Sequence, residues 1–261
     1  MRNLTVLNAT CINNQIENTV RLFNADHDDI MAVNSSGGSV DCIRRMLNHE
    51  PCDLLVLADD QIIANMMMPA YTDGYYVFAG NSMVLMPTRP GKSIDSSNWL
   101  DVLLDPTTTF GHFDPHGDPG GYRAVLACLL CDSLEQGVAG KLLNHTGRRI
   151  VTSHDDSPVD FMFGYRSGPF AKNKPYAELP EKINLSNPKL NEHYATARFD
   201  IDGDGKNVVY GSAICHALTI PFTATAPQAA LEFVQLFLQT DFVAAGFLPR
   251  SRTVGCWPPQ R

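Results

Sequence analysis

Hydrophobic and polar positions follow two alternating periods along the first part of the chain. Short apolar runs over 4–9 and 29–40 are typical of buried strands, and the segment 12–27 between them has the spacing of an amphipathic helix. A second helix is expected over 40–49 and a further apolar strand over 52–59. This alternation predicts a mainly parallel sheet with helices on its faces, whose ligands bind beyond the carboxyl ends of the strands.

The same alternation returns after a long apolar segment over 75–87 that no helix follows. A second α/β unit is expected over 99–166, and a second long strand-like segment over 208–221 precedes a helix over 227–240. Two α/β halves joined by two long segments predict a hinged pair of lobes. We expect lobe I to comprise 1–82 plus 211–261 and lobe II to comprise 83–210, with the hinge and ligand cleft between them.

Composition narrows the class of protein. The 261 residues are 44% hydrophobic and 18% charged, which is typical of a globular chain. A formal charge of −8 argues against nucleic acid as a partner, because phosphates require a basic face. No apolar run is long enough to span a bilayer, and the first ten residues resemble a strand, so we expect no signal peptide in this chain.

The seven cysteines favour buried thiols over a disulfide framework, because their number is odd and they lie in apolar segments. Cys128 and Cys131 form a C-x-x-C within an apolar run, which we interpret as a buried helix face. We interpret the tail over 252–261 as an irregular strap.

Three segments have the composition of oxyanion-binding turns, in which helix N-termini and short hydroxyl side chains surround an anion. They are Asn8–Cys11, Ser35–Val40 and Asp118–Arg123. Ser39 stands at the entrance to the second helix, and two glycines after Pro119 allow close backbone approach to a ligand. Taken singly, each segment is equally typical of a helix N-cap or a turn, and for Ser39 alone we favour the N-cap.

The chain resembles a known family through long segments in the same order. These are GGSVDCIRRM, CDLLVLADDQII, SSNWLDVLLDPTTTFGHFDPHGDPGGYR, FMFGYRS and AELPEKINLSNPKLNEHYA. Over nearly its whole length the chain is similar to the archaeal-type tungstate/molybdate-binding proteins of ABC transporters. This implies a type II periplasmic-binding-protein fold, a periplasmic or extracellular location, an ABC permease as partner, and a small oxyanion as ligand. We expect a monomer with no cofactor and no enzymatic activity.

The resemblance also implies a ligand shell. Ser39 matches a hydroxyl donor, Gly120 a backbone N–H that faces the anion, Tyr165 a tyrosine beside it, and Asp118 a carboxylate that adds an oxygen to tungsten. Where relatives have a serine after the first strand, this chain has Thr10 followed by Cys11, and we include both.

One position departs from the family in a way that bears on the ion. Gly164 stands where the resemblance predicts a second carboxylate, so a tetrahedral anion held by hydrogen bonds alone is an alternative to six-coordinate tungsten.

A divalent-metal site is the competing interpretation. His112, Asp114, His116 and Asp118 alternate along one segment, and imidazole with carboxylate suits a first-row cation. The run from Asp200 to Gly211 copies the start of a calcium loop but lacks the final glutamate, which favours a turn between two strands.

Overall fold

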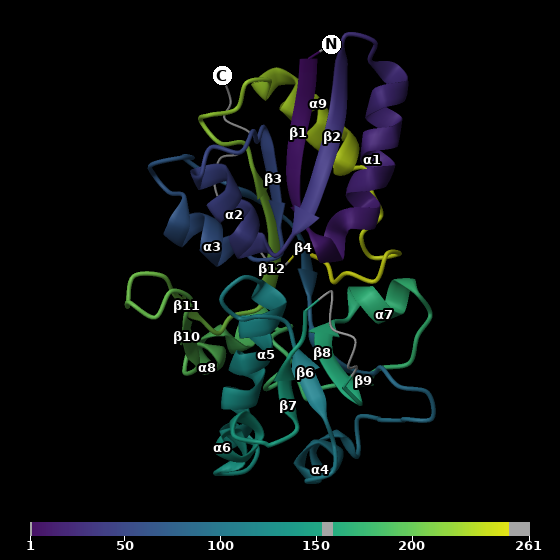
Figure 1. Cartoon of the computed structure of the whole chain (residues 1–261), viewed down its shortest axis with the longest axis vertical. Coiled ribbons are helices and arrows are strands. Elements are labelled where there is room, and N and C mark those ends of the chain that lie inside the picture. The colour runs from purple at the N-terminus through teal and green to yellow at the C-terminus, as the bar shows by residue number, and fades with distance from the viewer. Residues whose placement is uncertain (1, 153–158, 251–261) are drawn as a thin grey trace. The chain divides into compact units, whose positions relative to one another are not determined.

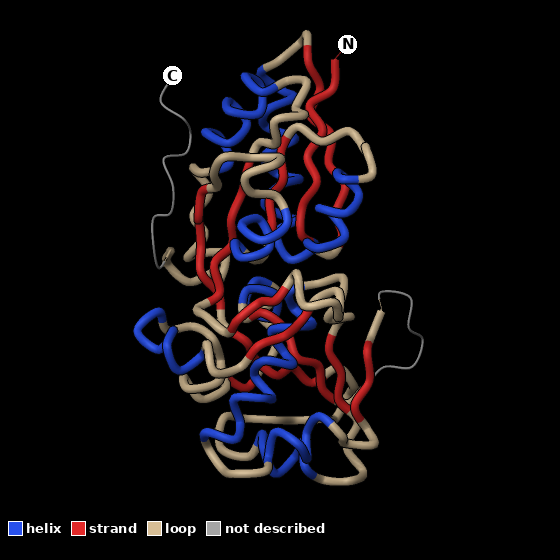
Figure 2. The backbone as a smooth tube through the Cα atoms, turned by 90° about the vertical axis from the view of Figure 1, so that its left-hand side faces the viewer, coloured by secondary structure: helices blue, strands red, loops and turns tan. Residues whose placement is uncertain are grey.

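The computed structural model describes residues 2–152 and 159–250. The chain in these ranges divides into two compact units, in each of which strands form a sheet with helices around it (Figure 2). Unit 1 comprises residues 2–79, 215–242 and 249–250. Unit 2 comprises residues 80–152, 159–214 and 243–248. The tail expected to form a strap over 252–261 lies outside the described residues, as does Cys256.

These units differ from the expected lobes mainly in one short segment. The first boundary lies at 79 rather than 82 and the second at 214 rather than 210, but 243–248 groups with unit 2. The reason is long-range pairing, because Gly80 and Leu248 exchange backbone hydrogen bonds of 2.8 and 2.9 Å. Arg166 also donates to the carbonyl of Gly246 at 2.8 Å. No local sequence pattern predicts these contacts.

Unit 1 follows the predicted alternation closely. Its elements are β1 (Arg2–Ala9), the short η1 (Thr10–Ile12), α1 (Asn13–Asp26), β2 (Ile30–Gly37), α2 (Ser39–Leu47), β3 (Leu54–Leu57), α3 (Asp60–Met66), β4 (Tyr76–Asn81), β12 (Ile214–Thr219) and α9 (Pro227–Phe237). The last residues of β4 and the first residue of β12 belong to unit 2.

The sheet of unit 1 has the order β2-β1-β3-β12-β4 within the described residues. β1 is parallel to β2 and β3, whereas β12 runs antiparallel to β3. Figure 1 shows α1 and α9 beside β1 and β2, and α2 and α3 near β3. The core contact between α1 and α9 is Phe23 on Phe233, with ring centroids 5.7 Å apart.

Unit 2 holds the second sheet. Its elements are β5 (Met83–Pro87), α4 (Trp99–Leu104), β6 (Phe110–His112), α5 (Pro119–Leu130), η2 (Cys131–Ser133), α6 (Val138–Leu143), β7 (Arg148–Ile150), β8 (Phe161–Tyr165), α7 (Ser167–Ala171), β9 (Ala177–Glu178), η3 (Pro188–Leu190), α8 (Asn191–Tyr194), β10 (Arg198–Asp200) and β11 (Val208–Tyr210).

The sheet of unit 2 has the order β7-β6-β8-β5-β9 within the described residues. β6 is parallel to β7 and β8, but β5 is antiparallel to β8 and β9. The predicted α/β class with helix-flanked sheets is therefore confirmed, while the sheets are mixed rather than mainly parallel. The antiparallel pairings in these two sheets involve β12 in unit 1 and β5 in unit 2, and each of these strands begins only a few residues after the preceding strand in the chain.

Two local predictions are borne out in detail. The run after Asp200 connects β10 to β11, which pair antiparallel, so the calcium-loop likeness is a turn between strands. Cys128 and Cys131 are buried on α5 and at its end, and burial raises the pKa of Cys128 to about 12. No disulfide joins cysteines within the described part of the chain, and none of its helices is long and apolar enough to cross a membrane.

A buried carboxylate fastens the parts of unit 1 together. Asp53 precedes β3 and is only 3% exposed. Its Oδ2 accepts the N–H of Thr5 on β1 at 2.8 Å. Its Oδ1 accepts the N–H groups of Thr225 and Ala226, before α9, at 2.6 and 2.9 Å. One side chain thus joins β1, β3 and the start of α9, which are far apart in sequence.

Replacing Asp53 by Asn should destabilise unit 1. The amide keeps the size of the side chain but offers only one accepting oxygen, so buried N–H groups lose their acceptor at a cost of roughly 3 kcal/mol. Urea denaturation should show this loss, and hydrogen exchange should accelerate in β1 and β3. Asp41→Asn, at an exposed position of α2, is the matched control and should leave both measurements unchanged. Equal stability of the two variants would contradict the role of Asp53.

Candidate functional site

The turn after β1 carries the first two expected ligand residues. Thr10 is exposed, and its hydroxyl donates to the carbonyl of Gly37 at the end of β2, at 3.3 Å. Cys11 is half-buried in the same short turn, η1. The contact between Thr10 and Gly37 brings the turn before α1 close to the segment that leads into α2.

Ser39 is the first residue of α2 and is fully buried. Its hydroxyl accepts a hydrogen bond of 3.0 Å from the N–H of Ala58, which directly follows β3. A hydroxyl that accepts one hydrogen bond still carries a proton to donate. The contact therefore holds the hydroxyl oxygen at the carboxyl ends of the strands. The O–H proton of Ser39 can still be donated to another acceptor.

Sequence reasoning did not identify an amide network under the β1 turn. The side chain of Asn34 donates to Oδ1 of both Asn8 and Asn13, at 3.2 and 3.0 Å, and Asn8 donates to Asn13 at 3.2 Å. Asn8 is fully buried. The network links the ends of β1 and β2 to the start of α1 and so holds the turn with Thr10 and Cys11 in place. The sequence signal for it is weak: one asparagine in each of the first two strands and a third at the start of the helix between them.

In unit 2, Asp118 is the N-cap of α5. Its Oδ1 accepts the N–H of Gly120 at 2.6 Å, and Pro119 occupies the first turn of the helix. The Gly120 N–H that we expected to face an anion therefore donates to the Asp118 carboxylate in this structure. A carboxylate is itself an anion, so the helix N-terminus has the polarity that we predicted for it.

Tyr165 lies next to Gly120. It is buried at the end of β8, opposite Met83 of β5. A methyl group added to Gly120 would be 3.9 Å from Cε2 of Tyr165 and 2.9 Å from Oδ1 of Asp118. The three residues expected in unit 2, Asp118, Gly120 and Tyr165, are therefore gathered at one point on the first turn of α5.

The neighbouring Gly121 fixes the loop in front of this turn. A Cβ at this position would lie 2.5 Å from the carbonyl oxygen of Phe113 and 2.7 Å from that of Asp114. No side chain fits there, because the contacted atoms are backbone. The loop after β6 and the first turn of α5 therefore pack directly on each other.

The divalent-metal interpretation finds no support in the structure. Both ring nitrogens of His112 are engaged, because Nδ1 lies 2.7 Å from the carbonyl oxygen of Phe113 and Nε2 accepts from Arg148 at 3.1 Å. Nδ1 of His116 lies 2.6 Å from the carbonyl oxygen of Ile201, and Asp114 accepts the N–H of His116. Among the described residues no group of three His, Cys, Asp or Glu side chains is arranged to hold a metal ion. Alternation along an extended strand would have aligned these side chains, but the segment curls into a turn.

Gly164 is tightly packed against a side chain. A Cβ at this position would lie 2.5 Å from Cε of Met86, on the neighbouring strand β5. The thioether of Met86 thus occupies the space beside Gly164 in which a side chain would begin. This chain accordingly lacks room for the second carboxylate unless Met86 moves.

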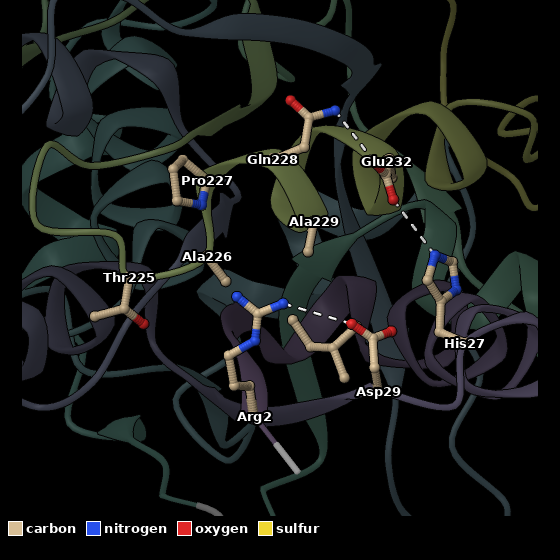
Figure 3. A pocket seen from close by; sticks show the side chains of 10 residues that line it. Arg2, His27, Asp29, Thr225, Ala226, Pro227, Gln228, Ala229 and Glu232 are labelled. Atoms are coloured by element: carbon tan, nitrogen blue, oxygen red, sulfur yellow. Dashed lines mark hydrogen bonds and ion pairs between the residues drawn. The ribbon is translucent and has the colours of Figure 1, made fainter.

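A separate pocket lies at the other end of β1 in unit 1. It has a volume of about 280 Å³ and lies beside the start of α9 (Figure 3). Two ion pairs line it, Arg2 with Asp29 at 3.5 Å and His27 with Glu232 at 3.4 Å. Because Arg2 begins β1 and Thr10 follows its end, this pocket is distinct from the expected ligand residues.

Two histidines should titrate on opposite sides of their ordinary pKa of 6.5. The hydrogen bond to the carbonyl of Phe23, aided by Glu232, raises the pKa of His27. Burial lowers the pKa of His112, and the Arg148 guanidinium acts in the same direction. His27 therefore stabilises the fold below pH 6.5, and this stabilisation is lost as the pH rises through its folded pKa. His112 stabilises the fold above pH 6.5, and this stabilisation is lost as the pH falls through its folded pKa.

NMR titration of the imidazole resonances measures both midpoints. Glu232→Gln should lower the midpoint of His27 and leave that of His112 unchanged, which provides an internal control. A midpoint for His112 at or above 6.5 would contradict the neutral ring that donates to Phe113 and accepts from Arg148.

Comparison with known proteins agrees with this architecture. A family model described as "Bacterial extracellular solute-binding protein" matches residues 4–246. An uncharacterized solute-binding protein of Petrotoga mobilis is 32% identical over 235 residues, which cover 84% of this chain and 73% of that protein. The molybdate/tungstate-binding protein WtpA of Pyrococcus abyssi is 26% identical over 238 residues, covering 78% of this chain and 69% of the relative.

A solved structure shows the same fold at low identity. The periplasmic molybdate-binding protein of Azotobacter vinelandii superposes with a TM-score of 0.69 at 15% identity, over 94% of this chain and 98% of that chain. Its likeness supports the two helix-flanked sheets. Since the family model spans nearly the full length, the chain belongs to the family of bacterial extracellular solute-binding proteins.

Proposed function

We propose that this solute-binding protein captures a small oxyanion of the tungstate and molybdate type and delivers it to an ABC permease from the periplasm or the cell exterior. The observation that carries the proposal is the grouping of Asp118, Gly120 and Tyr165 at the first turn of α5. The similarity to a molybdate/tungstate-binding protein supports the choice of ion.

The proposed binding chemistry is local. With a net charge of −8 the chain repels anions at long range, so affinity has to come from nearby donors. In unit 1 we propose Ser39 as a hydroxyl donor, with Thr10 and Cys11 beside it in the β1 turn. In unit 2 we propose the N–H of Gly120 and the hydroxyl of Tyr165. Hydrogen bonds to a charged group are worth about 1.5–3 kcal/mol each, so a few suffice for useful affinity.

Two roles of Asp118 toward the ligand can be distinguished, and they have opposite effects on the affinity for an anion. As an added oxygen ligand it would bind tungsten or molybdenum, which accept more than four oxygens, and would release the Gly120 N–H to the anion. As a plain cap it would stay on Gly120 and repel the anion. We propose the first role, because a carboxylate beside a bound anion is otherwise unfavourable.

Calorimetry with tungstate, molybdate and sulfate tests the proposal directly. We expect tungstate and molybdate to bind, and Tyr165→Phe to weaken binding roughly tenfold or more through loss of a hydroxyl beside the anion. Tyr194→Phe is the matched control: this buried tyrosine donates to the carbonyl of Glu181, and its loss should lower stability without changing affinity. Absence of binding to all three anions would refute the proposal.

Asp118→Asn separates the two roles of the carboxylate. Asn is also a good N-cap, so α5 should still begin at the same residue. If Asp118 ligates the metal centre, the variant should lose affinity for tungstate and molybdate and bind sulfate no worse. If Asp118 only caps α5, the affinity for all three anions should rise, because a negative charge has been removed. Melting temperatures of the variant and the wild type control for stability.

A further inference from the structure

A guanidinium group lies against the end of β2 in unit 1. Arg45 belongs to the last turn of α2, and its Nη2 donates to the hydroxyl oxygen of Ser35 on β2 at 2.7 Å. A Cβ added to Gly37, the last residue of β2, would lie 3.6 Å from Nη1 of Arg45. The positive charge of Arg45 is therefore held beside the segment that leads from β2 into α2.

Glu50 fixes the orientation of this guanidinium. Nε and Nη2 of Arg45 both donate to the Glu50 carboxylate, and the bond from Nε to Oε2 is 2.8 Å long. A bidentate pair of this kind holds the plane of the guanidinium. Within the described part of the chain, none of the hydrogen bonds of Arg45 uses Nη1. The carboxylate thus lies on one edge of the guanidinium, while the Nη1 atom is the one near Gly37.

Gly37 is also in contact with the proposed ligand residues of unit 1. Its carbonyl accepts the hydroxyl of Thr10 at 3.3 Å, and Ser39 begins α2 two residues later. The proposed donors of unit 1 are hydroxyl and thiol groups without charge. Arg45 consequently adds a full positive charge to the surroundings of these uncharged donors.

An ion pair as accessible as this one adds little to the stability of the fold. The side chains of Arg45 and Glu50 are 29% and 40% exposed, and such pairs are weak contributors to folding. The attraction between a guanidinium and an anion, however, grows in proportion to the charge of the anion, and it extends over roughly 8 Å at physiological ionic strength. A fixed cation beside Gly37 therefore favours a dianion over a monoanion of the same size.

We propose that Arg45 is a specificity-determining residue, whose charge beside Gly37 makes the site select dianionic over monoanionic tetrahedral oxyanions. The inference rests on the proposed function, since it takes Thr10 and Ser39 as ligand residues of unit 1. It deepens that function by naming the charge class of the ligand and the side chain that selects it, without direct contact between the two.

Two substitutions that break the same ion pair test the proposal. Calorimetry on the full chain measures the affinity for tungstate, and we expect Arg45→Gln to weaken it roughly fivefold because a positive charge is lost. Glu50→Gln should strengthen it about twofold or more, because the charge of Arg45 is then no longer offset. A purely structural role of the pair would change the affinity in the same direction in both variants, so the opposite signs identify the effect of charge.

Perrhenate tests the selectivity itself, because it is a tetrahedral oxyanion similar in size to tungstate but carries one negative charge instead of two. The wild type should bind tungstate about tenfold or more tightly than perrhenate. Arg45→Lys keeps the positive charge and should recover most of the tungstate affinity that Arg45→Gln loses.

Arg21→Gln provides the matched control. Arg21 is exposed on α1, where it donates to Asn18 at 2.9 Å, and it lies outside the proposed ligand residues. Its loss changes the net charge of the chain by the same amount as the loss of Arg45, and it should leave the tungstate affinity unchanged. Melting temperatures of all four variants should lie near that of the wild type, because each altered side chain is at least partly exposed.

The outcomes separate this inference from the proposed function. Tungstate binding that falls in Arg45→Gln and rises in Glu50→Gln would support the role of Arg45. Tungstate binding that shifts in the same direction in both variants, or in neither, would overturn that role and leave the anion function standing, as would equal affinities of the wild type for tungstate and perrhenate. Absence of binding to tungstate, molybdate and sulfate alike would overturn both proposals.

Discussion

The direct packing of two backbone segments organises the candidate site of unit 2. Gly121 of α5 approaches the carbonyl oxygens of Phe113 and Asp114 so closely that a single Cβ would separate them. This contact positions the loop after β6. The cap that Asp118 forms on Gly120 and the Phe113 ring lie next to it. The loop gains its shape from this packing, and the chemistry of the turn depends on that shape.

The same helix is tied to the end of unit 2 by a buried cation. Arg123, two residues after Gly121 on α5, is fully buried and donates to the carbonyl of Ser212 at 2.9 Å. Ser212 lies just before β12, through which the chain returns to unit 1. In unit 1 the corresponding fastening is Asp53, whose carboxylate joins β1, β3 and the start of α9. Each unit thus has a buried charged side chain that binds main-chain groups distant in sequence.

Hydrogen bonds to main-chain carbonyls engage two histidines that the alternating pattern had marked as metal ligands. On an extended segment, His112 and His116 would have faced one way with Asp114 and Asp118. In the folded chain His112 instead supports the backbone of Phe113, and His116 contacts the carbonyl of Ile201. These ring nitrogens hydrogen-bond to main-chain carbonyl groups and so stabilise the conformation of the loop. The loop exposes Phe113, Asp114 and His116, of which no motif had marked Phe113.

The sequence by itself determined the α/β class, most element positions and the resemblance that selected Ser39, Asp118, Gly120 and Tyr165, because helix and strand periods and N-cap residues are local properties. Tertiary structure alone decided that 243–248 joins unit 2, that Met86 fills the space beside Gly164, and that the loop after β6 packs on Gly121. These outcomes depend on contacts between residues far apart in the chain or on the exact turn of a loop. Such contacts form only when each unit folds, so no spacing along the sequence encodes them.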